Sequence, residues 1–285
     1  MKKINKVLKI SFITNFFLAI FKIIVGFIGS SSSLIADGIH SFSDLITDIV
    51  ALVGNSFSFK PADNEHPFGH GKLEYLTCLF VGVVVLLLGL GLIGKAGTNE
   101  IIKPSMIVIF ASIFTIITKY FLANYLIKKG RIFKNNILIS SGKESKADVI
   151  SSIIVLISSI LMQYSDSFNI LKYSDMIATI IVGIFIVKTG YMILRDNISM
   201  LLGEKENDPI LIKKMHETIL KYKEIKNIDS FLIMKNGPYY TLTLEVGMSG
   251  RISLQKSHDI IENIENDLKN NYDKVKYINI HVNPY

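Results

Sequence analysis

Long apolar stretches alternate with short polar connections over the first two thirds of the chain. The second and the fifth stretch are the least apolar, and their polar residues recur at the three-to-four-residue spacing of a single helix face. Lipid would reject such a face, so we expect both helices to line the interior of a helical bundle. Each stretch is long enough to cross a bilayer, which takes about 20 helical residues, and six can be drawn: residues 8–29, 32–58, 73–94, 105–127, 136–163 and 170–194.

The pattern changes after Asn197 to that of a small soluble domain. Asp208 followed by Pro209 predicts the start of an amphipathic helix. Two alternating segments, 228–234 and 239–246, then predict strands joined by a turn at Asn236, Gly237 and Pro238.

A second helix and a last strand complete this domain. The helix begins near Ser253 and carries Leu254, Ile261 and Leu268 on one side, and the strand covers residues 277–282. The order α, β, β, α, β favours an open-faced sheet with helices on one side, as in ferredoxin-like folds. We therefore predict an all-α membrane domain of six helices at residues 1–198 and a ferredoxin-like α+β domain at residues 199–285.

Composition agrees with a membrane protein. Of 285 residues, 49% are hydrophobic, and the single cysteine, Cys78, excludes both a disulfide framework and a cysteine-rich zinc site. The net charge of +7 would suit a nucleic-acid partner, yet the lysines and arginines gather beside the apolar stretches and in the tail. We therefore expect the lipid bilayer, and not a nucleic acid, to explain the charge.

The basic residues also predict an orientation. Ten lysines and arginines flank the ends of the stretches on the side of the N-terminus, and three flank the other ends. Because basic residues accumulate on the cytoplasmic side, we expect a multi-pass protein of the cell membrane with both termini in the cytoplasm. The ten are Lys2, Lys3, Lys6, Lys9, Lys60, Lys72, Lys128, Lys129, Arg131 and Lys134; the three are Lys95, Lys103 and Lys172.

Two pairs of ionisable residues lie inside the polar-faced helices. His40 and Asp44 are one turn apart in the second stretch, and Glu144 and Asp148 are one turn apart in the fifth. Charge at bilayer depth is costly and usually marks a pathway or a bound ion. Two helices that each offer two ligands predict a divalent metal site in the membrane.

The chemistry of these ligands predicts an exchange. Crowded carboxylates in a low-dielectric interior cannot all ionise cheaply, so the empty site should hold protons. A divalent cation needs deprotonated ligands, and its entry would expel those protons. If the site opens alternately to the two sides, this competition yields metal/proton antiport. The alternative is that these residues hydrogen-bond helices together, and we assign that structural role to Asp37, which we expect to pair with Lys22.

The connection after the second stretch carries a second set of candidate ligands. Asp63, His66 and His70 lie within eight residues, and one acid with two imidazoles suits zinc. The alternative is that the prolines and glycines around them, among them Pro67 and Gly69, fix a turn whose histidines are solvated.

Several strings in order along the chain resemble the cation diffusion facilitator family of divalent-metal transporters. The resemblance covers nearly the whole chain and implies a six-helix membrane domain with a cytoplasmic ferredoxin-like domain, a homodimer, and metal export coupled to proton entry. The strings are SLIADGIHS at 33–41 with Asp44, KPADNEHPFGHGK at 60–72, SKAD at 145–148 and IHVNP at 280–284.

The resemblance also bears on the ligands. It implies metal at positions matching Asp63, His66 and His70. In the tail, His258 and His281 match family ligands, Asp229 and Glu245 stand where zinc-binding relatives commonly have histidine, and Asn283 replaces an acid. A tail metal would join sheet and helix, or two subunits, and ordinary surface polarity is the alternative.

The ligand residues indicate the identity of the metal less directly than they indicate a metal site. Zinc-carrying relatives usually have histidine where this chain has Glu144, and an oxygen-rich set suits manganese or ferrous iron better than an imidazole-rich one. The resemblance favours zinc, then iron, then manganese, as transported substrate and regulatory ligand, with no prosthetic group.

Two other functions use the same ligands. A membrane metalloenzyme would activate water at the site, but the chain has no H-E-x-x-H string and no obvious general base apart from the ligands themselves. A metal sensor would signal through the tail without transport. We expect a transporter and not an enzyme.

Overall fold

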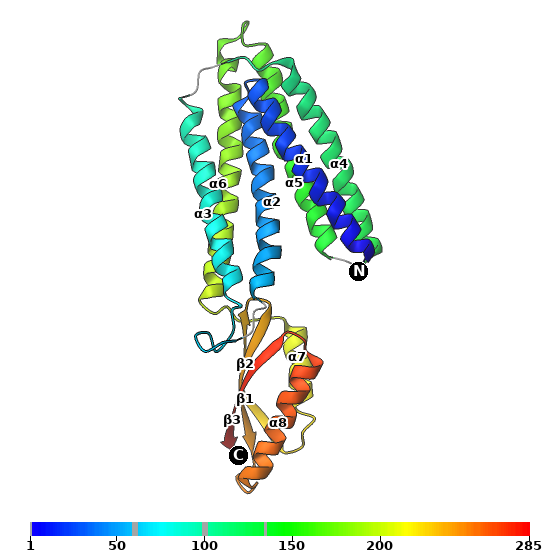
Figure 1. Cartoon of the computed structure of the whole chain (residues 1–285), viewed down its shortest axis with the longest axis vertical. Helices are drawn as coiled ribbons and strands as arrows, with labels where there is room; N and C mark the ends of the chain where they lie inside the picture. The colour runs from blue at the N-terminus through cyan, green and yellow to red at the C-terminus, as the bar shows by residue number, and fades with distance from the viewer. Residues whose placement is uncertain (1, 59–61, 99–101, 134–135) are drawn as a thin grey trace. The chain divides into compact units, whose positions relative to one another are not determined.

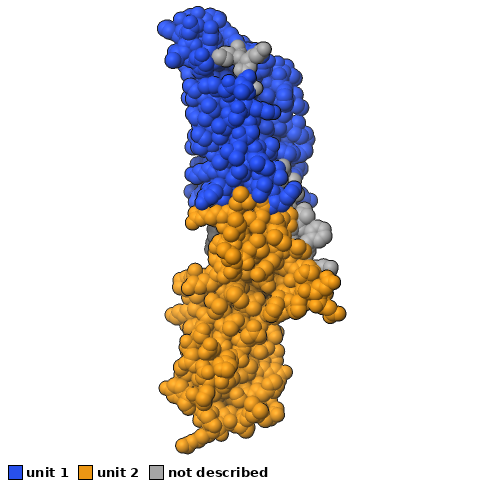
Figure 2. Space-filling view, turned by 90° about the vertical axis from the view of Figure 1, so that its left-hand side faces the viewer, with its two compact units in different colours: residues 1–49, 80–193 blue, residues 50–79, 194–285 orange. Residues whose placement is uncertain are grey.

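The computed structural model describes the backbone of residues 2–58, 62–98, 102–133 and 136–285. The side chains of residues 2–5, 46–58, 136, 137 and 140 lie outside the description, and so do those of Lys2, Lys3, Lys60 and Lys134 in the orientation count. The chain forms two compact units, blue and orange in Figure 2: residues 1–49 with 80–193, and residues 50–79 with 194–285. The second unit thus joins residues of the predicted membrane domain to the tail, and a division at residue 198 stays a prediction.

Long helices form at each of the predicted apolar stretches (Figure 1). Most ends agree with the prediction within a few residues, but the last helix starts later, because Asn169–Tyr173 form a separate 3₁₀ helix, η1. The described helices are α1 (Lys2–Ile28), α2 (Ser32–Ser58), α3 (Leu73–Ala96), α4 (Met106–Ile132), α5 (Asn136–Gln163) and α6 (Ser174–Leu201).

Within the described residues, five helical segments are long and apolar enough to cross a membrane. They belong to α1, α3, α4, α5 and the joined η1 and α6. Only the first half of α2 has described side chains, so its crossing of the membrane stays a prediction.

The helix α4 has its polar residues inside and its largest apolar residues outside. Thr115 and Lys119 are buried, whereas Phe110 and Phe121 are about two-thirds exposed, at 71% and 67%. A helix in water would have the opposite arrangement. The exposed phenylalanines therefore suit a lipid environment, and the buried face keeps its polar groups within the bundle.

The helices α4 and α5 form a closely packed hairpin. A Cβ atom at Gly142 of α5 would lie 2.6 Å from Cγ1 of Ile127 and 3.0 Å from the carbonyl oxygen of Ala123, both in α4. Glycine at this position lets the two backbones approach, as small residues do in membrane helices generally.

The tail has the predicted order of elements. It consists of α7 (Pro209–Ile219), β1 (Ile225–Asn236), β2 (Tyr239–Met248), α8 (Leu254–Asn271) and β3 (Val275–Pro284). The sheet order is β1-β2-β3, with β1 and β2 antiparallel and β2 and β3 parallel. The prediction of a small α+β domain after the helical region is confirmed.

Local signals explain where the two tail helices begin. Asp208 caps α7 by accepting a hydrogen bond from the Ile210 N–H at 2.9 Å, and Pro209 occupies the first turn. Ser253 caps α8 by accepting one from the Lys256 N–H at 3.3 Å. Both predicted helix starts are confirmed.

The core of this domain lies between the sheet and its two helices. The predicted strand face of Leu242, Leu244 and Val246 is fully buried. The predicted face of α8 is partly wrong, because Leu254 is 88% exposed in the first turn and Ile261 is only partly buried. The helix instead buries the stripe Ile260, Ile264 and Leu268, which packs on the sheet with Met215 and Ile219 of α7.

Candidate metal centres

Three of the four predicted membrane ligands come together between α2 and α5. His40, Asp44 and Asp148 each offer one ligand atom, and these atoms lie within 4.8 Å of one another. Nδ1 of His40 is 3.9 Å from Oδ2 of Asp44. A tetrahedral ion with bonds of about 2.1 Å holds its ligands about 3.4 Å apart, so a small inward movement would suffice to grip one. We call these three residues the membrane cluster.

His40 is the residue of the cluster whose polar atom most needs a partner. Its Nδ1 is buried and has no hydrogen-bond partner among the described residues. An unsatisfied buried polar atom costs about 1–3 kcal/mol, which a bound cation would offset. Nδ1 of His40 is therefore better suited to bind a metal ion than to make a helix-packing contact.

The fourth predicted ligand, Glu144, is not part of this group. Glu144 is exposed on α5, whereas Asp148, one turn further along the same helix, is buried. The described cluster therefore has one imidazole and two carboxylates, and the role of Glu144 stays a prediction.

A lysine that the sequence pattern did not point to lies beside Asp148. Nζ of Lys119, on α4, lies 2.5 Å from Oδ2 of Asp148, and the two side chains are only 2% and 6% exposed. A lysine in the middle of an apolar stretch was the signal that could have marked it. Its partner could not be read from the sequence, because the pair joins neighbouring helices.

The predicted pair of Lys22 and Asp37 is confirmed. Nζ of Lys22 lies 2.7 Å from Oδ2 of Asp37, and both side chains are fully buried. Lys22 also donates to the hydroxyl oxygens of Ser41 and Ser152 at 3.2 and 3.0 Å, and the Ser151 hydroxyl donates to Asp37. A buried pair whose remaining hydrogen bonds are satisfied is a structural feature of the bundle.

Asp175, in the first turn of α6, caps another helix. Its carboxylate accepts hydrogen bonds from the Ser31 hydroxyl and the Ser32 N–H, each at 2.9 Å, and from the Ser33 hydroxyl at 2.6 Å. These groups lie at the start of α2, where free N–H groups and the helix dipole favour a negative charge. Asp175 thus fixes the N-terminal end of α2, the helix that carries His40 and Asp44.

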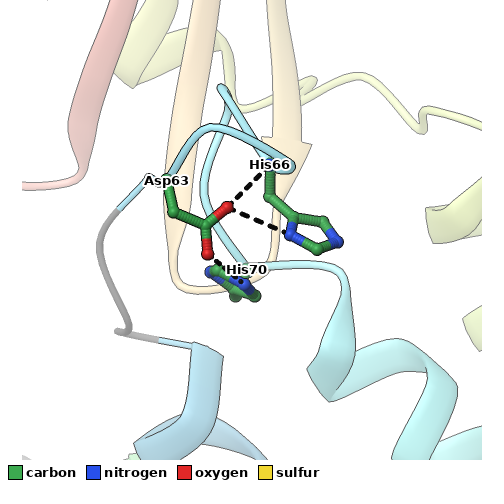
Figure 3. Close-up of side chains that lie close together, drawn as sticks. All are labelled: Asp63, His66 and His70. Atoms are coloured by element: carbon green, nitrogen blue, oxygen red, sulfur yellow. Dashed lines mark hydrogen bonds and ion pairs between the residues drawn. The ribbon is translucent and has the colours of Figure 1, made fainter.

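The loop residues Asp63, His66 and His70 form a second group, which we call the loop cluster (Figure 3). Oδ1 of Asp63 lies 3.2 Å from Nδ1 of His66, and Oδ2 lies 3.4 Å from Nε2 of His70. One ligand atom from each residue lies within 4.8 Å of the others. Asp63 and His66 are exposed, and His70 is buried.

The loop cluster is preorganised by its own backbone. Oδ1 of Asp63 accepts the His66 N–H at 2.7 Å, and this hydrogen bond holds the pKa of the Asp63 carboxyl below its usual range. The carboxylate therefore stays ionised and available to a cation. The predicted turn is also present, with Gly69 at a φ of 73°, so turn and ligand group coexist.

A tyrosine that no sequence motif marks ties this loop to the β1–β2 hairpin. The Tyr239 hydroxyl donates to the carbonyl oxygen of Phe68 at 2.7 Å and accepts the Gly71 N–H at 2.9 Å. In return, the Gly237 N–H donates to the Tyr75 hydroxyl at 2.7 Å. The residues on both sides of His70 are thus bound to the sheet.

The predicted tail ligands are not gathered into a comparable group among the described residues. Glu245 and His281 are register partners on β2 and β3, whereas His258 lies exposed on α8. Asp229 and Glu245 are bridged by the Asn283 amide, whose nitrogen donates to them at 2.9 and 3.2 Å. A metal held by Asp229, Glu245, His258 and His281 stays a prediction.

Comparison with known proteins decides the family. Residues 8–202 match the family described as "Cation efflux transmembrane domain", and residues 207–285 match "Cation efflux protein, cytoplasmic domain". The chain belongs to the cation efflux family. This confirms the resemblance to the cation diffusion facilitators, and the protein is accordingly a multi-pass membrane transporter and not an enzyme.

Cation efflux relatives in Bacillus subtilis align with nearly all of the chain. The manganese efflux system protein MneP is 31% identical over 286 residues, which cover 99% of this chain and 96% of the relative. The manganese efflux system protein MneS is 25% identical, with 94% and 91% covered. A cadmium, cobalt and zinc/H(+)-K(+) antiporter is 28% identical, with 93% and 85% covered.

Proposed function

We propose that this cation efflux protein exports a divalent metal ion from the cytoplasm, and that the ion binds at His40, Asp44 and Asp148. The observation that carries the proposal is the convergence of three ligand atoms from two helices within 4.8 Å, in the interior of an apolar bundle. Buried ionisable groups are costly there unless they bind or conduct an ion. We keep Glu144 as a ligand that would join from α5 when metal is bound.

We further propose that protons move in the opposite direction. A divalent ion binds ionised carboxylates and a neutral imidazole, so its arrival releases protons and its departure returns them. The inward proton gradient then drives export if the cluster opens alternately to the two sides.

We place manganese first among the substrates and zinc second, which differs from the order of zinc, iron and manganese expected from the sequence. Two carboxylates with one imidazole form an oxygen-rich set, and such sets suit manganese. The names of MneP and MneS add support, and the name of the cadmium, cobalt and zinc antiporter keeps zinc in the comparison.

We also propose a homodimer with both termini in the cytoplasm. The lysine and arginine count supports this orientation, and so does the match of the tail to a family described as cytoplasmic. With this orientation, the loop cluster would be a second metal site, on the cytoplasmic side. Its support is the hydrogen bonding of the loop around His70 to the β1–β2 hairpin, together with the ionised Asp63 carboxylate.

Transport in sealed proteoliposomes tests the main proposal. Manganese, zinc, ferrous iron, cobalt and cadmium would be supplied outside vesicles that contain a pH dye. We expect manganese to enter fastest and the lumenal pH to rise as protons leave. Metal entry without a pH change would contradict the proton coupling but not metal transport. If no metal entered, transport itself would be contradicted and a metal sensor would be favoured.

Two matched substitutions assign the site. Asp44→Ala should reduce uptake to the level of empty vesicles, because it removes a ligand of the membrane cluster. Asp166→Ala should leave uptake unchanged, because this acid is 80% exposed and pairs with Lys103 outside the cluster. Wild-type uptake by folded Asp44→Ala would contradict the assignment.

A further inference from the structure

A positive charge lies directly beside the membrane cluster. Oδ2 of Asp148 lies 2.5 Å from the ammonium of Lys119. The other buried lysine of the bundle interior described above, Lys22, pairs with Asp37, an acid outside the cluster. One lysine thus touches a candidate ligand directly, and the other does not.

The packing of α4 against α5 fixes this contact. Gly142 allows the two backbones to approach at Ala123, and Lys119 lies one helical turn before Ala123 on the same buried face. In an antiparallel hairpin, this brings Lys119 level with the turn of α5 that carries Asp148. Helix packing therefore places the backbone of Lys119 beside that turn, and the ion pair that the structure shows for its ammonium is with Asp148.

An ammonium and a divalent cation cannot share one carboxylate oxygen. Both carry positive charge, and their repulsion in a dry interior is far stronger than in water. A metal that takes Oδ2 of Asp148 together with His40 and Asp44 must therefore displace Lys119, and a metal at Oδ1 is still repelled by the nearby ammonium.

We propose that Lys119 is a tethered counter-ion of the transport site, which neutralises Asp148 when the metal is absent and competes with the metal for it. The inference rests on the proposed binding of metal at His40, Asp44 and Asp148. Lys119 is a positioning residue, because it acts through Asp148 and does not bind the metal. Its effect is to weaken metal binding, and a transporter needs binding weak enough to release its cargo.

Manganese titration of the purified full chain in detergent tests this role, with free Mn²⁺ followed by electron paramagnetic resonance. The relevant binding is the part that Asp44→Ala removes. Lys119→Gln should tighten it by about tenfold or more, because the competing charge is gone. Lys119→Arg keeps the charge and should stay within about threefold of the wild type.

Lys22→Gln is the matched control, since it removes the other buried ammonium from its ion pair. It should lower the thermal stability of the metal-free protein without tightening the Asp44-dependent binding. A purely structural role for Lys119 predicts the same result for Lys119→Gln. Unchanged or weaker binding by folded Lys119→Gln therefore overturns the proposal.

The outcomes separate this inference from the proposed function. If Asp44→Ala and the wild type bind manganese equally, the transport site itself is wrong. If Asp44→Ala loses binding while Lys119→Gln changes nothing, only the counter-ion role fails.

A second measurement uses the unmodified protein and decides the question if Lys119→Gln does not fold. Cryogenic electron microscopy of the wild type with Mn²⁺ should find Nζ of Lys119 beyond hydrogen-bond distance from Asp148. Manganese bound to His40 and Asp44 beside an intact Lys119–Asp148 pair would overturn the proposal.

Discussion

The membrane cluster and the loop cluster contain similar ligands but balance their charges differently. In the membrane cluster, Asp148 is almost fully buried and is neutralised by Lys119 from a neighbouring helix. In the loop cluster, Asp63 is 42% exposed and is held by two backbone N–H groups and two imidazoles. Water can stabilise the Asp63 carboxylate, whereas the Asp148 carboxylate depends on the fixed ammonium of Lys119.

This difference shows how environment decides the cost of a carboxylate. An ion removed from water needs an opposite charge and complete hydrogen bonding, or the fold loses several kcal/mol. An exposed carboxylate needs neither, and its ion pairs contribute little. Substitutions in the bundle should therefore have larger effects than substitutions around the loop.

The largest expected effect is at the fully buried pair of Lys22 and Asp37. Lys22→Met leaves Asp37 as an uncompensated charge and should lower the free energy of unfolding by about 3–5 kcal/mol, measured by denaturant titration in mixed micelles. The double variant Lys22→Met with Asp37→Leu removes both charges and should recover most of the loss. A single-variant loss below about 1 kcal/mol would indicate that the pair behaves like an exposed one.

The next effect concerns the close approach of the loop to the hairpin. Gly237 has a φ of 63°, and a Cβ atom there would lie 2.2 Å from the carbonyl oxygen of Gly71. Gly237→Ala should therefore cost at least about 2 kcal/mol, from backbone strain and overpacking together. Gly203→Ala is the control for strain alone, because Gly203 also has a positive φ, 96°, but an added Cβ atom would lie 4.0 Å from Sδ of Met234. Equal losses of stability in the two variants would mean that the close contact of the loop with the hairpin adds nothing to the cost.

The hydroxyl of Tyr239 should contribute less. Tyr239→Phe leaves the Gly71 N–H without its hydroxyl partner and the Phe68 carbonyl with only the longer bond from the Asn236 amide, which should cost about 1–3 kcal/mol. Hydrogen exchange should speed up at Gly71 and around His70. Tyr277→Phe is the control, because the Tyr277 ring lies 5.8 Å from that of Tyr239, and it should leave that exchange slow. Faster exchange in both variants would point to ring packing as the cause.

Much of the fold follows from the sequence pattern, and some of the sites do not. Runs of apolar residues and local caps such as Asp208 depend on neighbours in sequence, so the helices and tail elements could be predicted. Lys119 and Tyr239 act on residues far away in the chain, so only the packed structure reveals their partners. Leu254 was misplaced because a helix's first turn extends beyond the core that the rest of the helix covers.

The smallest expected effect is a pH dependence at the loop cluster. The His66 N–H lowers the pKa of Asp63, so its stabilising contribution should be complete above about pH 4, where an ordinary aspartate is ionised. It should be lost as the pH falls through the lower pKa of the folded protein. The check is the difference in melting temperature between wild type and Asp63→Asn across the acid range. A difference that grows as the pH falls would contradict this sign.

The most direct test of the central claim is the location of the bound metal. Crystals of the full chain grown with manganese should give an anomalous-difference peak between α2 and α5, within bonding distance of His40, Asp44 and Asp148. A second peak at Asp63, His66 and His70 would be compatible with the account. Peaks confined to the loop or the tail, with none between α2 and α5, would contradict it.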